Sequence, residues 1–240
     1  MSQLDLKARH IWIYMLMLLP FGLVFVGRER LWFVAREDGV VEYLGAICFL
    51  AAAVLFGMAS VRAHRHASLS KAHVLVLGLF ALLCLFACGE EVSWGQRIFG
   101  IATPEWLQSA NYQGELNLHN IGVPNGSEGS LLYFVTHFSW NGPFFGLLFI
   151  VIPWLDPRWS LARNLFSRFG IPIFPAYLAG VTLFIYVVLK IAELYLSGMV
   201  GYDPNWAREI WESLMGVLMI VAASGELAKA SGPRQQDRLA

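Results

Sequence analysis

Long apolar stretches separated by charged or Gly/Pro-rich segments dominate the pattern of this chain. A helix rises about 1.5 Å per residue, so about 20 apolar residues are needed to cross a bilayer. Six stretches approach this length, at about residues 11–27, 40–59, 74–89, 131–155, 171–196 and 209–225. The pattern therefore predicts an all-α integral membrane protein whose single polytopic domain, residues 1–230, has about six transmembrane helices. The polar segment 231–240 is expected to be a disordered cytoplasmic tail.

Basic residues are distributed unevenly between the two sides that these spans define. One side carries eleven, namely Lys7, Arg9, Arg62, Arg65, Lys71, Arg158, Arg163, Arg168, Lys229, Arg234 and Arg238, whereas the other carries five. Because cytoplasmic segments retain Lys and Arg, this bias places both termini in the cytoplasm. Most acidic residues fall on the opposite, outer side. The asymmetry suits the inner membrane of a bacterium, with the outer face toward the periplasm.

The composition supports this class and removes several others. Hydrophobic residues make up 57% of the 240 residues, charged residues 14%, and mean hydropathy is +0.56. The formal net charge is zero, so no electrostatic attraction to nucleic acid is expected. Cys48, Cys84 and Cys88 all lie in apolar runs without CxxC spacing, which disfavours a disulfide framework or a thiolate metal site. Glycines such as Gly45 and Gly216 are expected to let neighbouring helices approach closely.

The segment 90–130, between the third and fourth predicted spans, is long for a loop without a function. Glu90 and Glu91 leave an apolar helix and are followed closely by Trp94, Gln96 and Arg97. Adjacent helical positions point about 100° apart, so at most one carboxylate is expected to face solvent while the other turns toward the bundle. Further on, Thr103-Pro104-Glu105 has the pattern of a helix start and predicts a short helix lying at the membrane interface.

The second half of this loop carries Glu115, Asn117 and His119 at alternate positions. They share a face if the segment is extended, and Glu115 and His119 still pair if it is helical. The segment is then a lid or a wall of a site. Alternatively it is a solvated, turn-rich connection whose Asn and Gly residues serve backbone geometry.

Further ionisable residues fall at the outer ends of other predicted spans, where such groups by default mark a site. Lys190 and Glu193 have the spacing of an ion pair. Glu212 is expected to lie deeper than Glu209, which is expected to be solvated. Glu42 has the position of an acid stabilised by a helix N-terminus, and His137 that of a packing histidine. Each of these groups can alternatively belong to a common site.

Two kinds of chemistry use such residues: a divalent metal such as Zn²⁺ or Mn²⁺ held by Glu and His, or a desolvated Glu acting as general base. The sequence contains no HExxH, GxSxG or Walker A motif that would decide between them. The candidate catalytic residues are Glu90, Glu91, His119 and His137. The candidate substrate-binding residues are Trp94, Gln96, Arg97, Asn117 and Asn141, and the candidate metal ligands are Glu91, His119, Glu193 and Glu212.

Part of this set resembles the EExxxR, FxxxH and HxxxN motifs of the CAAX-protease-like intramembrane glutamate proteases. The matching segments are Glu90-Glu91 with Arg97, and the stretch from Tyr133 through His137 to Asn141. Arg97 lies two positions late, Tyr replaces Phe, and one histidine serves two motifs, so the chain is not assigned to this family. The resemblance implies that Glu90 or Glu91 activates water while His137 and Asn141 stabilise an oxyanion.

Three functions fit the sequence. The first is a membrane-embedded hydrolase or transferase that acts on a lipid-linked or membrane peptide substrate at the outer face. The second is a non-enzymatic subunit or scaffold whose outer loop docks a membrane or periplasmic protein. The third is an ion- or proton-coupled transporter, which is disfavoured because the carboxylates gather at one face and the centres of the spans lack charge.

Overall fold

The computed structural model describes residues 39–66, 69–111, 114–118, 121, 141–155, 158–197 and 205–231. This part of the chain is mostly helical and contains no β-strand, only an isolated bridge between Asn111 and Ile121. The all-α class is therefore confirmed.

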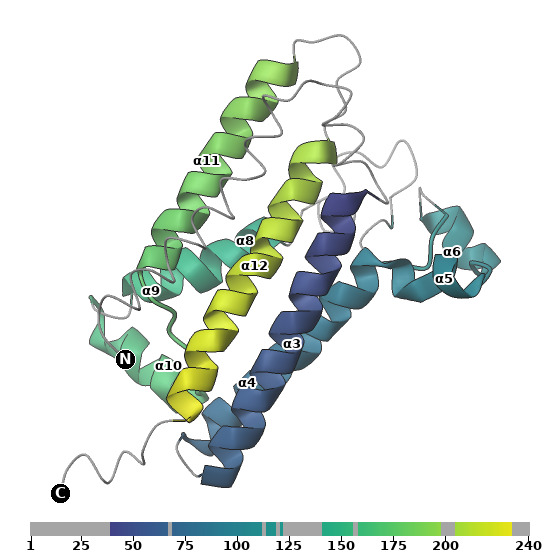
Figure 1. The fold of residues 1–240 in the computed structure, drawn as a ribbon. Helices are drawn as coiled ribbons and strands as arrows, with labels where there is room; N and C mark the ends of the chain where they lie inside the picture. The colour runs from purple at the N-terminus through teal and green to yellow at the C-terminus, as the bar shows by residue number, and fades with distance from the viewer. Residues whose placement is uncertain are drawn as a thin grey trace, which may run out of the picture.

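Among the described residues, three helices are long and apolar enough to cross a membrane: α3 (Val40–His66), α4 (Lys71–Glu91) and α12 (Asn205–Ala230, apolar from Glu209). They correspond to the predicted spans 40–59, 74–89 and 209–225, and each extends beyond the predicted bounds. Figure 1 shows α3 between α12 and α4, and these two pairs make the most extensive helix contacts in the described structure. The protein is thus a membrane-associated helical protein.

Two other predicted spans appear as shorter apolar helices. The fourth is described from residue 141, as α8 (Asn141–Gly146), the π-helical turn η2 (Leu147–Val151) and α9 (Ile152–Leu155). The fifth becomes α11 (Tyr177–Ser197), which begins after a non-helical stretch that contains Pro172 and Pro175. The first predicted span, 11–27, lies outside the described residues. Six membrane spans therefore remain a prediction.

The charged connection between the fourth and fifth predicted spans contains a helix that the apolar pattern does not predict. This helix, α10 (Ser160–Phe169), is amphipathic: Ala162 is buried, whereas Leu161, Leu165 and Phe169 on the same apolar side are exposed. It ends at Gly170, whose left-handed conformation favours glycine. With ten residues, this helix is too short to be predicted as a membrane span.

Small residues fix the register of α12 against α3. Ser213 Oγ donates a hydrogen bond to the Val41 carbonyl at 2.6 Å, and a Cβ added at Gly45 would lie 2.9 Å from the same Oγ. One turn further, a Cβ at Gly216 would lie 2.9 Å from Cys48 Cβ and 3.2 Å from the Gly45 carbonyl oxygen. The prediction that Gly45 and Gly216 permit close approach is confirmed.

A buried carboxylate ties α4 to α12 near the other end of the bundle. Glu226 is 1% exposed and accepts hydrogen bonds from Lys229 Nζ at 2.6 Å and from the His73 ring at 2.9 Å. Because His73 lies in the first turn of α4, this contact joins the start of α4 to the last turns of α12. The predicted sixth span ends at residue 225, one position before this group.

Replacing Gly216 by alanine tests the α3/α12 contact. The added methyl group has no room beside Cys48, so we expect a loss of about 1–3 kcal/mol of stability, as for overpacked cores. Thermal unfolding of the purified protein in detergent measures it. Gly180→Ala on α11 is the control, because nothing lies within 4 Å of its added Cβ. Equal unfolding temperatures for the two variants would contradict the close contact.

Candidate functional site

The two adjacent carboxylates at the end of α4 have different surroundings. Glu90 is buried: its Oε1 accepts a hydrogen bond from Trp94 Nε1 at 2.7 Å, and its Oε2 accepts one from the Leu118 backbone N–H at 2.7 Å. Glu91 is half-buried and turns toward α12. The expectation that at most one of the pair faces solvent agrees with this arrangement, since neither side chain is exposed. Glu90 joins α4 to the loop that follows, which leaves Glu91 to face the bundle.

A strained turn follows these two residues. Ser93, Trp94 and Gly95, which form the short helix η1, have φ values of 45°, 53° and 74°. The left-handed region is unfavourable for the two non-glycine residues and persists only where the surroundings hold it. Here Ser93 Oγ donates to Glu115 Oε2 at 2.6 Å and accepts from Asn117 Nδ2 at 3.0 Å. The second half of the loop thus holds the turn in place.

The described part of the loop that follows α4 is held by its own polar contacts and contains α5 (Gln96–Phe99) and α6 (Glu105–Ala110). Gln96 donates to Thr103 Oγ1 at 2.5 Å and accepts from the Leu116 N–H at 2.6 Å. Arg97 forms an ion pair with Glu115. Figure 1 shows α5 and α6 lying to one side of the three long helices. The helix predicted at Thr103-Pro104-Glu105 corresponds to α6, and its place at a membrane interface remains a prediction.

Asn117 is the centre of this network. Its Nδ2 donates to Ser93 Oγ and, at 2.9 Å, to Glu115 Oε2, while its Oδ1 accepts from Asn111 Nδ2 at 2.8 Å. The predicted substrate-binding residues Trp94, Gln96, Arg97 and Asn117 therefore all have partners within the loop or on α4. These contacts assign them a role in positioning the loop, and any contact with a substrate remains a prediction.

Three carboxylates from two helices meet where α4 ends and α12 begins. One oxygen each of Glu91, Glu209 and Glu212 lies within 4.8 Å of the others. We call these three residues the carboxylate trio, and this end of the bundle the carboxylate end. The predicted metal ligands Glu91 and Glu212 are thus brought together.

Glu209 corrects the sequence analysis, because it is 4% exposed rather than solvated. The helix begins at Asn205, one turn before the predicted span, so Glu209 lies inside α12 and one turn before Glu212. The i, i+3 spacing of the two acids, which places them on one side of the helix, is the signal that could have identified it.

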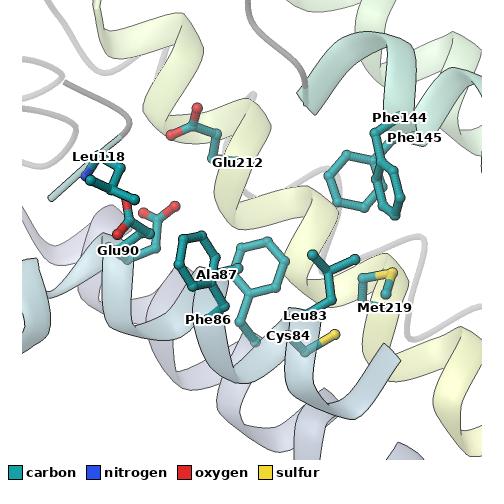
Figure 2. Close-up of a pocket in the computed structure, with 12 residues that line it drawn as sticks. Leu83, Cys84, Phe86, Ala87, Glu90, Leu118, Phe144, Phe145, Glu212 and Met219 are labelled. Atoms are coloured by element: carbon teal, nitrogen blue, oxygen red, sulfur yellow. The ribbon is translucent and has the colours of Figure 1, made fainter. Parts of the chain in front are cut away.

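A pocket of about 440 Å³ adjoins the carboxylate trio. Figure 2 shows Glu90 and Glu212 at one end of it and the rings of Phe144 and Phe145 away from them. Apart from Glu90, Glu91 and Glu212, its lining is apolar, sulfur-containing or aromatic: Phe49, Leu83, Cys84, Phe86, Ala87, Leu118, Phe144, Phe145 and Met219. The pocket therefore has one acidic end and an apolar remainder.

Several predicted site residues are not placed. His119 and His137 lie outside the described residues, and the side chains of Asn141 and Glu193 are likewise not described. Their proposed roles, and the pairing of Lys190 with Glu193, remain predictions. Leu118, which precedes His119 in the chain, lines the pocket.

Comparison of the chain with protein-family models, with curated proteins and with solved structures gave no match. The function must therefore be argued from the site. Three convergent carboxylate oxygens are a ligand set for hard divalent cations, and a carboxylate beside an apolar pocket can also move a proton.

Replacing Asn117 by alanine tests the loop network. The change removes three side-chain hydrogen bonds from a buried position and leaves their partners poorly satisfied. We expect this to lower the stability of the loop by about 1–3 kcal/mol. We expect amide hydrogen exchange at Leu116 and Leu118 to become at least about fivefold faster. Ser109→Ala is the control, because the hydrogen bond that Ser109 Oγ donates to the Trp106 carbonyl lies within its own helical turn. Unchanged exchange in Asn117→Ala would contradict this role.

Proposed function

We propose that this protein is a membrane-embedded hydrolase or transferase that holds a divalent cation at the carboxylate trio. The observation that carries the proposal is the convergence of Glu91, Glu209 and Glu212 within 4.8 Å. Three carboxylates this close repel one another, and repulsion is stronger in a low-dielectric bundle than in water. A cation among them offsets that repulsion and uses all three as ligands.

The donor set favours a cation that prefers oxygen, such as Mn²⁺ or Mg²⁺. Zn²⁺ fits better if His119 also contributes, since imidazole is its more usual ligand. Bound there, the cation supplies Lewis-acid chemistry, polarising a carbonyl or phosphoryl oxygen of the substrate.

The chain's own residues then have separable tasks. A carboxylate oxygen of the trio accepts a proton from the attacking water, or from an acceptor hydroxyl in a transferase. The oxygen of that nucleophile bonds to the carbonyl carbon or the phosphorus, the bond to the leaving oxygen, or to the leaving nitrogen of a peptide, breaks, and the proton ends on that leaving atom. Glu90 positions the loop through Trp94 and Leu118.

The proposal also includes the topology predicted from the charge distribution. Six spans with both termini in the cytoplasm place the end of α4, and with it the carboxylate trio, at the periplasmic face of a bacterial inner membrane. The substrate would then be a lipid-linked molecule or a membrane peptide in the outer leaflet.

A second function, a scaffold whose outer loop docks a protein, is favoured by one observation. Ile98, Phe99 and Trp106 in the loop are strongly exposed although the loop is held by its own hydrogen bonds. Such apolar groups suit either a protein partner or the membrane surface. Copurification of a stoichiometric partner without bound metal would favour the scaffold.

Metal binding tests the enzyme proposal. We expect about one Mn²⁺ per chain in elemental analysis of the detergent-purified protein after loading and removal of excess metal. Each of Glu91→Gln, Glu209→Gln and Glu212→Gln should lower the Mn²⁺ affinity by at least about tenfold, because each removes one anionic ligand.

The matched control is Glu105→Gln, which neutralises an exposed acid on α6 outside the trio and should bind Mn²⁺ like the wild type. Analysing His119→Ala in parallel shows whether that residue belongs to the site. An absence of stoichiometric binding of Mn²⁺, Mg²⁺ or Zn²⁺ by the wild type would overturn the proposal.

A further inference from the structure

The pocket beside the carboxylate trio restricts the class of substrate. Its volume of about 440 Å³ lies within the range of about 300–1,000 Å³ found for small-molecule sites. We propose that it binds a hydrocarbon chain of an amphiphile whose ester or other polar group lies at the trio. This inference rests on the proposed function and selects a lipid-linked substrate over a membrane peptide.

The chemistry of the lining decides between those two substrates. Every lining side chain except those of Glu90, Glu91 and Glu212 is hydrocarbon, aromatic or sulfur-containing. A peptide in the pocket would bring backbone N–H and C=O groups away from water with few side chains to pair them, and each unpaired group is costly. A hydrocarbon chain brings no such groups, so an apolar lining accommodates it without an unpaired polar group.

The separation of acidic and apolar lining residues in the pocket sets the orientation of a bound amphiphile. The carboxylates lie at one end, and Figure 2 shows Phe145 and Met219 away from them. Phe49, Phe145 and Met219 are buried, so they close the apolar part and set a limit to chain length. An amphiphile therefore fits in one direction only, with its polar group at the trio.

The position of the pocket on α4 gives a route of entry. Leu83 and Phe86 line the pocket and are also each 42% exposed. Both lie within the apolar span Lys71–Glu91. The pocket thus borders the side of α4 that lies at hydrocarbon depth, and a lipid chain can enter from the bilayer without crossing water.

A chain-length series tests the inference. Full-length protein in nanodiscs is loaded with Mn²⁺, and the binding of alkyl phosphates from butyl to hexadecyl is measured, with partition into empty nanodiscs subtracted. Expressed against the free aqueous concentration of the alkyl phosphate, affinity should rise about fourfold per methylene and then level off once the pocket is full. A rise that continues through the whole series, or no rise, would overturn the inference.

Two pocket variants and one control variant test whether the plateau in affinity arises from the pocket. Ala87→Phe projects a ring into the lining and should lower the affinity for dodecyl phosphate at least about tenfold. Leu82→Phe introduces the same ring on the same helix at an exposed position outside the pocket, and should bind like the wild type. Phe144→Ala should move the plateau to longer chains, a gain that misfolding cannot produce. Equal series for all four proteins would overturn the proposed pocket.

Mn²⁺ binding, measured on the same samples, separates the two proposals. Bound Mn²⁺ without dependence on chain length would reject the hydrocarbon chain and leave the metal-dependent function standing. Chain-length dependence with a plateau, but without stoichiometric metal, would support the hydrocarbon-binding pocket and reject the metal-dependent function.

Discussion

Burial of carboxylates in an apolar helix bundle is the constraint on which this structure depends. A charged carboxylate removed from water is costly unless donors or cations surround it. Glu90 meets this requirement with the Trp94 indole and the Leu118 amide, and Glu226 meets it with His73 and Lys229. Each set of hydrogen bonds also connects distant segments: Glu90 connects α4 with the loop, and Glu226 connects α12 with α4. In the carboxylate trio three acidic groups converge on one another, and the proposed cation would offset their mutual repulsion.

The geometry of the trio follows from how α12 is held. Ser213, the residue after Glu212, is fixed against the start of α3 by its bond to the Val41 carbonyl, and Gly216 keeps the two backbones close. Near its other end, α12 is fixed to α4 through Glu226. Two attachments on one helix prevent it from sliding or rotating independently, so the acidic side chains of its first turns are held toward the end of α4. Such prior positioning is what a metal or catalytic site requires.

Apolar length and small-residue spacing were enough to predict the class, the three long helices and the close approach at Gly45 and Gly216. The amphipathic helix α10 was missed because its short apolar face lies within a charged connection. Glu209 was assigned to solvent because the predicted membrane span began at that residue, whereas α12 begins one turn earlier, at Asn205. The sequence predicted a common site for Glu91 and Glu212, but the pocket beside them could not be predicted, since no local pattern specifies the space between distant helices.

The adjacency of Glu90 and Glu91 links the loop to the site. Consecutive helical residues point in different directions, so one carboxylate holds the loop while its neighbour joins the trio. The loop in turn needs the strained turn at Ser93 and Trp94, which its own hydrogen bonds maintain. Through the same Glu90 contact, Leu118 is positioned at the pocket. The loop is therefore a wall of the pocket rather than a free connection, and a change in its hydrogen bonding acts directly on the space beside the trio.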